Sequence, residues 1–236
     1  MKKEKPMGLL INGSLRSSGV TFYLKKGRMV ARSARSMERR SNTREQFIQR
    51  QRIRHITSLW QSLKWCKPMF TEHTTAYWGF LSLAARMPAV YTTKNMVYAS
   101  LLMPGIPVGD GTLPPVGQQL GEVDGVPALL TDLTADRLQH GDQLRLFTAT
   151  QQIHTDTPMV LFGVREVEAD ELIEVDGKLA LVGDDFADEM KGWALVHVSG
   201  KRCSPQQIVT QSTYYQQYTT EEALQRAAKS YGGLTR

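Results

Sequence analysis

The sequence predicts an α+β fold: a β-hairpin and a helical hairpin first, then an antiparallel β-sandwich, then a short C-terminal helix. Apolar and polar residues alternate near the amino terminus, and helical periodicity follows from about residue 42. Short β-favouring runs separated by turn residues occupy the second half of the chain. The predicted domains are a basic region over 1–88, a Pro- and Gly-rich linker over 89–127, and a β-rich domain over 128–236.

Composition is that of an ordinary globular protein, with 41% hydrophobic and 22% charged residues. No stretch approaches the roughly 18 apolar residues that a membrane span needs. The apolar run from Met7 to Ile11 is shorter than the about 7 to 15 residues of a secretory signal, so we expect a mature, cytoplasmic chain. Cys66 and Cys203 have no neighbours at metal-ligand spacing, which favours two reduced thiols.

Charge divides the chain into two parts. Residues 1–67 carry 17 Lys or Arg against 3 Asp or Glu, whereas residues 68–236 carry 12 against 20. A basic segment of this kind is typical of chains in which it binds a polyanion, an acidic protein or the acidic part of the same chain. Charge alone does not choose among these three partners.

The first elements are two β-favouring runs, VTFYL at 20–24 and RMVAR at 28–32. Lys25, Lys26 and Gly27 separate them, and the glycine can adopt positive φ, so we predict a hairpin. One face of it is apolar and the other carries charge, as in a half-buried ribbon. We expect this hairpin to fold against the helix that follows, and residues 33–41 to be an extended, arginine-rich connector.

Helical periodicity begins at Asn42 or Thr43, either of which can cap a helix, with Glu45 or Gln46 placed to complete a capping box. The pattern predicts an amphipathic helix of about six turns that ends near Pro68. A second helix is predicted over 71–87, stopped by Pro88. We interpret Trp60, Trp65 and Trp78 as packing between the two helices rather than as a base-stacking platform.

The segment 89–127 is too rich in Pro and Gly for a long helix and reads as a linker or a loop-rich traverse with short strands. Strands are then predicted at 142–150, 158–167, 171–175, 178–182, 192–200 and 206–212. Their spacing and turn residues favour an antiparallel sandwich or barrel. The last element, TTEEALQRAAKSYGG, predicts a short helix with a glycine C-cap.

No catalytic or cofactor motif stands out in the sequence. The five histidines form no metal-ligand pattern, and neither a phosphate-binding loop nor a nucleophile elbow occurs. Carboxylates cluster over 166–171 and 184–189, but without the register of a calcium loop, so we interpret them as solvated acidic loops. We therefore expect no enzyme activity, no cofactor and no metal.

Basic residues are the candidate contact site. They lie in the hairpin, the connector and the first helix: Lys25, Lys26, Arg28, Arg32, Arg35, Arg39, Arg40, Arg44, Arg50, Arg52 and Arg54. They could neutralise nucleic-acid phosphates, without sequence reading, and such binding would weaken steeply with salt. They could equally meet acidic groups of a partner or of the same protein, or stay solvated.

The first 65 residues resemble a family of uncharacterised bacterial and mobile-element proteins, in which an SGxVG-like segment leads through a hairpin ending in Arg-Ser to Asn-x-x-Thr and a Gln-Arg helix. The matching residues are Ser18, Gly19, Val20, Tyr23, Gly27, Arg32, Ser33, Asn42, Arg44, Gln46, Gln49 and Arg50. This chain differs in having Arg16 and Ser17 where Gly-Lys is common, and in its longer connector. The resemblance implies an Ig-like C-terminal part and no established activity; similar segments occur in phage-like structural proteins.

The function we expect is that of a non-enzymatic structural or assembly protein of phage or mobile-element origin, either cytoplasmic or incorporated in a virion-like assembly. Its basic N-terminus would attach it to protein partners or to other copies of itself. The alternative is a nucleic-acid-binding protein that uses the arginine-rich first third for phosphate contacts. A β-sandwich module that binds a carbohydrate or a peptide is a third possibility.

Overall fold

In the computed structural model the chain is α+β and forms two compact units, Met1–Ser41 and Asn42–Arg236. The structure describes residues 14–17, 20–33, 43–96, 99–153 and 157–234. Among them are three α-helices and several antiparallel sheets. We refer to Met1–Ser41 as the N-terminal unit and to Asn42–Arg236 as the body.

The N-terminal unit contains a three-stranded antiparallel sheet of β1 (Ser14–Ser17), β2 (Val20–Lys25) and β3 (Arg28–Ser33). The predicted hairpin of β2 and β3 is confirmed, and its two-residue turn has positive φ at both Lys26 (53°) and Gly27 (74°). These angles suit the twist of paired strands. β1 was not predicted, since four residues are too short for alternation to be visible. The expected packing of this hairpin on the first helix stays a prediction.

The first predicted helix is confirmed as α1 (Arg44–Leu63), which begins after Thr43, whose hydroxyl accepts a hydrogen bond from the Gln46 amide. The second helix, α2 (Ala76–Ala84), is shorter than predicted. Residues before it are held in a loop because Asp110 accepts hydrogen bonds from the Thr71 and Glu72 amides, at 2.7 and 3.3 Å. The helix therefore begins after its own cap, Thr75.

The predicted role of the tryptophans is right for one of three. Trp60 packs with its ring centroid 5.4 Å from that of Phe80, in the contact between α1 and α2. Trp65 is 79% exposed and Trp78 is 57% exposed, so neither packs between the helices. Helical spacing did not reveal this, because Trp65 lies beyond the end of α1.

Residues 89–127 are part of the body's core, which agrees with the predicted loop-rich traverse with short strands and not with the alternative of a linker. Their buried side chains include Val90, Leu101, Met103, Ile106 and Val108, which share a cluster with residues of α1, α2 and the central sheet. Proline and glycine prevent a helix here, but they do not prevent burial. β4 (Pro107–Gly109), β5 (Gln118–Val123) and β6 (Val126–Thr131) also lie in this segment.

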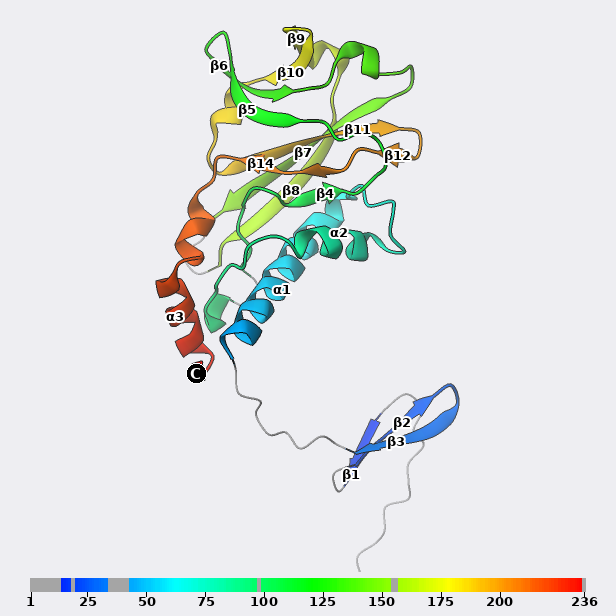
Figure 1. Ribbon diagram of the computed structural model, residues 1–236, viewed down its shortest axis with the longest axis vertical. Coiled ribbons are helices and arrows are strands. Elements are labelled where there is room, and N and C mark those ends of the chain that lie inside the picture. The colour runs from blue at the N-terminus through cyan, green and yellow to red at the C-terminus, as the bar shows by residue number, and fades with distance from the viewer. Residues whose placement is uncertain (1–13, 18–19, 34–42, 97–98, 154–156, 235–236) are drawn as a thin grey trace, which may run out of the picture. The chain divides into compact units, whose positions relative to one another are not determined.

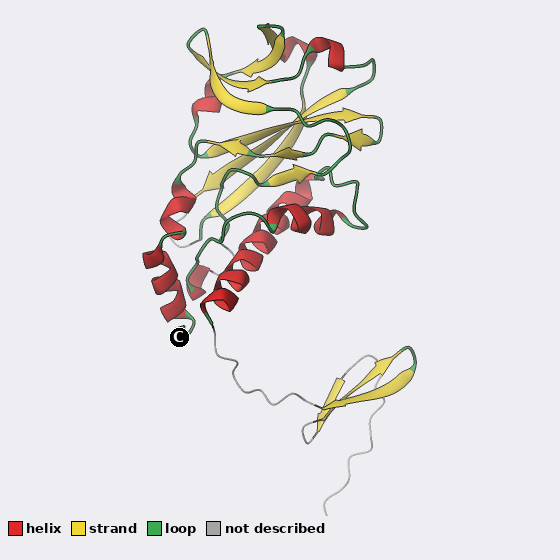
Figure 2. Ribbon diagram, in the orientation of Figure 1, coloured by secondary structure: helices red, strands yellow, loops and turns green. Residues whose placement is uncertain are grey.

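Two larger antiparallel sheets, a two-stranded sheet and a helical layer are found in the described residues of the body (Figures 1 and 2). The central sheet has the order β12-β11-β7-β8, with β14 beside β11, and the outer sheet has the order β5-β6-β10-β9. The remaining strands are β7 (Gln143–Gln152), β8 (Met159–Glu166), β9 (Leu172–Val175), β10 (Lys178–Val182), β11 (Lys191–Ser199), β12 (Arg202–Cys203), β13 (Gln206–Gln207) and β14 (Val209–Thr210). β13 pairs with β4. The strands predicted at 142–182 and 192–200 are confirmed.

The side chains of β11 alternate between the two faces of the central sheet and contact a different layer on each face. Trp193 and Leu195 face the outer sheet and pack with its leucines, whereas Ala194 and Val196 face α1 and α2. The outer sheet and the helices thus cover opposite faces of the central sheet (Figure 1). The predicted C-terminal helix is confirmed as α3 (Glu221–Ser230), followed by Gly232 and Gly233 at positive φ.

Candidate functional site

The arginines of α1 bind groups of the body itself. Arg44 forms an ion pair with Glu221 of α3 at 2.7 Å, between side chains that are both more than half exposed. The Arg54 guanidinium lies 4.8 Å from the ring centroid of Tyr231 and donates a hydrogen bond to its hydroxyl. These contacts connect α1 to the C-terminal segment, and they favour the interpretation in which arginines pair within the protein.

Arg52 of α1 also binds a group of the body, in this case next to α2. Its Nε donates a hydrogen bond to the Met87 carbonyl at 3.0 Å, just beyond the end of α2, and its Nη1 donates to Gln49 at 3.1 Å. Arg50 also lies on α1 and is exposed. At least Arg44, Arg52 and Arg54 of the predicted contact residues therefore have intramolecular partners.

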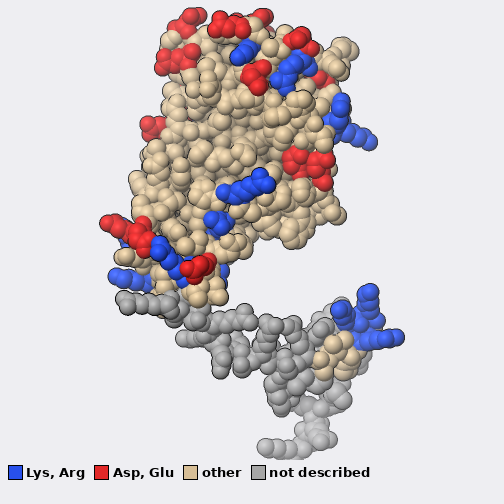
Figure 3. Space-filling view, in the orientation of Figure 1, with Lys and Arg blue, Asp and Glu red and all other residues tan. Residues whose placement is uncertain are grey.

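The N-terminal unit holds the other predicted contact residues. Lys25, Lys26 and Arg28 surround the β2–β3 turn, where their side chains are exposed and make no ion pair with any residue that the structure describes (Figure 3). Arg32 lies in β3, and Arg35, Arg39 and Arg40 fall outside the described residues. Residues 1–41 carry 11 Lys or Arg against 2 Asp or Glu, whereas the body carries 18 against 21.

Register gives the small sheet two different faces, because directly opposed residues of antiparallel strands lie on the same face. One face carries apolar positions: Leu15, Phe22, Leu24, Met29 and Ala31. The other carries Arg16, Thr21, Lys25, Arg28 and Arg32, together with Tyr23 and Val30. Met29, whose side chain is described, is 60% exposed. The described residues of the N-terminal unit form this sheet, and they include no second layer that would cover its apolar face.

The outer sheet of the body presents a second apolar surface, which the sequence reading did not identify. Its outward positions include Val126 and Leu130 of β6, Ile173 of β9 and Val182 of β10. The valines and Ile173 are 36–38% exposed. A hollow of about 240 Å³ opens on this face, lined in part by Leu130 and Lys178. We refer to this surface as the outer sheet face.

Carboxylates surround the outer sheet face. Residues 166–189, which contain β9 and β10, carry ten Asp or Glu and one Lys. Figure 3 shows acidic side chains gathered at this end of the body. The exposed carboxylates at this end that form no ion pair within the described residues include Glu122, Asp124, Glu174, Asp176 and Asp184. The predicted acidic loops are thus the border of an apolar sheet face.

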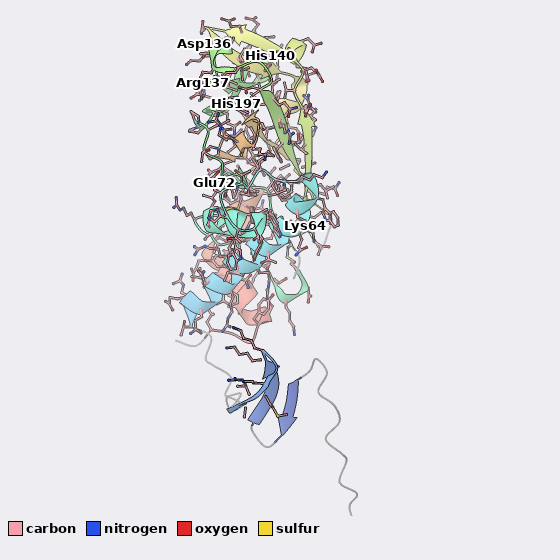
Figure 4. The ribbon with its side chains drawn as sticks, turned by 90° about the vertical axis from the view of Figure 1, so that its right-hand side faces the viewer. Lys64, Glu72, Asp136, Arg137, His140 and His197 are labelled. Atoms are coloured by element: carbon pink, nitrogen blue, oxygen red, sulfur yellow. The ribbon has the colours of Figure 1, made fainter. Side chains whose placement is uncertain are left out.

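A buried histidine–aspartate pair lies at the edge of the central sheet. His197 Nε2 and Asp142 Oδ2 are 2.7 Å apart, and both side chains are less than a tenth exposed. Hydrogen bonds from the Ser199 hydroxyl, the Gln139 amide and His197 lower the pKa of Asp142 to about 2. Figure 4 shows His140 near the same end of the body. The pair anchors the loop before β7 to β11.

A second polar cluster surrounds Asp110, whose Oδ2 lies 2.7 Å from His73 Nδ1. Cys203 lies nearby and donates a hydrogen bond to the Met69 carbonyl at 3.3 Å. Burial raises the pKa of the Cys203 thiol, and a thiol kept protonated is a poor nucleophile. In the described part of the chain, no three His, Cys, Asp or Glu side chains are placed to hold a metal ion.

A cavity of about 680 Å³ is lined by prolines, glycines, aliphatic residues and glutamines, two of which are Gln118 and Gln206. Both glutamines are used within the protein: Gln118 Nε2 donates to the Gln207 carbonyl at 2.8 Å and Gln206 Nε2 to the Val116 carbonyl at 2.9 Å. The cavity therefore offers shape but few free polar groups to a ligand.

Comparison of the chain with protein families, with curated proteins and with solved structures finds no match. Within the described residues, no helix combines the length and the apolar character that crossing a bilayer requires. The proposed function therefore rests on the charged and apolar surfaces described above.

Proposed function

We propose that this chain is a non-enzymatic structural or assembly protein, of phage or mobile-element origin, that attaches to a larger assembly through its basic N-terminal unit. In this proposal the acidic β-rich part, of the Ig-like kind that the resemblance implies, projects from the attachment. The resemblance of the first 65 residues to segments of phage-like structural proteins supports the origin. The chain would be found in the cytoplasm or in a virion-like particle.

The observation that carries the proposal is the location of the positive charge. The basic excess belongs to a compact unit of its own, and three of its cations at the β2–β3 turn are exposed. Exposed charge on a small unit steers association with a surface of opposite sign. The arginines of α1, in contrast, contribute to the packing of the body.

Nucleic-acid binding is the alternative, and it would rest on the N-terminal unit rather than on α1. Three α1 arginines already bind a carboxylate, a carbonyl or a phenol of the body. Phosphate contacts from them would require these interactions to break. A grip confined to the N-terminal unit would be weak and would lose affinity with salt.

The test is rate-zonal sedimentation of lysate from native-host cells that produce the full-length chain, with and without nuclease. We expect the wild type in the fast-sedimenting fraction whether or not nuclease is added. The variant Lys25→Glu/Lys26→Glu/Arg28→Glu should move to the slow fraction, since its turn repels an acidic surface. Release of the wild type by nuclease would support the alternative, and a slow-sedimenting wild type would contradict both.

A further inference from the structure

We propose that the outer sheet face binds the N-terminal unit of a second copy of this chain, so that copies associate head to tail. The inference rests on the proposed function, because it names the partner to which the basic unit attaches. It joins two surfaces with exposed apolar residues: the outer sheet face, and the apolar face of the β1–β3 sheet, on which Met29 and Ala31 are exposed.

Both surfaces contain apolar residues that could pack against each other. The outer sheet face exposes Val126, Val182 and Ile173, which lie on three consecutive strands of the sheet, β6, β10 and β9. In the β1–β3 sheet, the opposed pairs Leu24–Met29 and Phe22–Ala31 lie on one face. Two sheets that each have one apolar face bury both by packing face to face at about 10 Å.

The charges around the outer sheet face favour the N-terminal unit as the group that binds there. Turn carboxylates border the outer sheet face: Asp124 lies in the β5–β6 turn and Asp176 in the β9–β10 turn, and both are exposed. The N-terminal unit carries 11 basic residues against 2 acidic ones. An apolar centre with an acidic border thus meets an apolar centre with a basic border, both within one sequence.

The size of the contact predicts a weak association. A sheet of three strands about 4.8 Å apart and six residues long, at about 3.3 Å per residue, presents roughly 300 Å². The total buried area is then about 600 Å², or somewhat more with side chains, which is below the roughly 1,200–2,000 Å² of specific, stable interfaces. We expect dissociation in the micromolar to millimolar range, strengthened when many copies are held together.

Because the two surfaces differ, the association is heterologous. Each copy can donate its N-terminal unit to one neighbour and accept another at its outer sheet face, so the chain of copies has no fixed end. A symmetric dimer would instead use the same surface twice. This difference makes the proposal testable with two variants that have complementary defects.

The experiment is light scattering of the purified full-length chain from about 1 to 500 µM. The donor variant is Lys25→Glu/Lys26→Glu/Arg28→Glu, and the acceptor variant is Ile173→Asp/Val182→Asp. We expect the wild-type mass to rise with concentration past that of a dimer, and each variant to associate at least tenfold more weakly. An equimolar mixture of the two variants should recover association, because the intact unit of one fits the intact face of the other, and it should stop at a dimer.

Leu161→Asp/Val164→Asp is the matched control, since these side chains are 43% and 41% exposed on the central sheet. It should associate like the wild type, and circular dichroism should show all variants folded. A monomeric wild type, a mass that stops at two, a mixture that stays monomeric or an equally impaired control would each overturn the inference. Monomers in vitro together with fast, nuclease-resistant sedimentation in cells would overturn it while leaving the proposed function standing.

Discussion

Protonation of His55 should destabilise the body between pH 6.5 and pH 4. His55 lies on the buried side of α1 and is 2% exposed. Its Nε2 is 3.3 Å from the Leu101 amide nitrogen and 3.4 Å from the Leu101 carbonyl oxygen. Burial lowers the pKa of His55 from 6.5 to about 4. The imidazole is therefore neutral in the folded protein wherever the pH exceeds 4.

The size of the effect follows from the two pKa values. Between pH 6.5 and pH 4 the unfolded chain binds a proton at His55 and the folded chain does not, so stability falls as the pH falls. Each pH unit in this window costs about 1.4 kcal/mol, and the window spans roughly 2.5 units. The total loss is about 3 kcal/mol, a large fraction of a typical unfolding free energy.

Urea denaturation of the wild type and of His55→Leu at pH 7, 6, 5 and 4.5 measures this effect. Other groups titrate in the same range, so the difference in pH slope between the two proteins is the quantity to compare. The wild type should lose more stability than the variant, and the exposed His140→Gln control should follow the wild type. Parallel slopes for the wild type and His55→Leu would refute the reasoning.

Three further predictions concern the body. Arg54→Met removes a hydrogen bond and a cation–π contact and should lower the unfolding free energy by about 1.5 kcal/mol, whereas Arg44→Met removes an exposed ion pair and should cost less than about 1 kcal/mol, both measured by urea denaturation. The lowered pKa of Asp142 contributes stability above pH 3.8 that is lost as the pH falls toward 2, so Asp142→Asn should flatten acid unfolding in that window, followed by circular dichroism. Gly111→Ala would place a Cβ 2.1 Å from a backbone carbonyl oxygen and should cost about 3 kcal/mol by thermal unfolding, whereas Gly163→Ala meets nothing within 4 Å and should cost little beyond its backbone effect.

Each of these comparisons has an outcome that would contradict it. Equal losses of unfolding free energy in the two arginine variants would show that the contact of Arg54 with Tyr231 contributes no more stability than the exposed ion pair of Arg44. An unchanged acid transition in Asp142→Asn would remove the buried pair as a source of acid sensitivity. Equal melting temperatures for the two glycine variants would mean that the close backbone approach at Gly111 is absent.

Local elements were predictable wherever a single period or a single turn determines them. Thr43 begins α1 through its own hydroxyl, and the Lys26-Gly27 turn joins β2 and β3, so neighbouring residues were sufficient. The burial of segment 89–127 was not predictable in this way. Its contacts come from distant parts of the chain, such as the hydrogen bonds that Gln51 accepts from the amide and hydroxyl of Thr92.

The candidate contact residues show the same limit. Periodicity placed the arginines of α1 on a helix but could not show that Arg54 meets Tyr231, 177 residues away. The outer sheet face was missed because its apolar positions come from β6, β9 and β10, and only the pairing of these strands brings them together. Alternation in 178–182 was a usable signal, since it puts Leu179 and Leu181 on the core side and Val182 on the opposite side.

The central claim is that attachment depends on the positive charge of the N-terminal unit and not on net charge. Sedimentation of cell lysates tests it most directly, with Lys25→Glu/Lys26→Glu/Arg28→Glu compared with a variant that reverses three exposed cations of the body: Lys94, Lys201 and Arg202. The two variants have the same net charge. We predict that only the first leaves the fast-sedimenting fraction; equal release of both, or of neither, would contradict the claim.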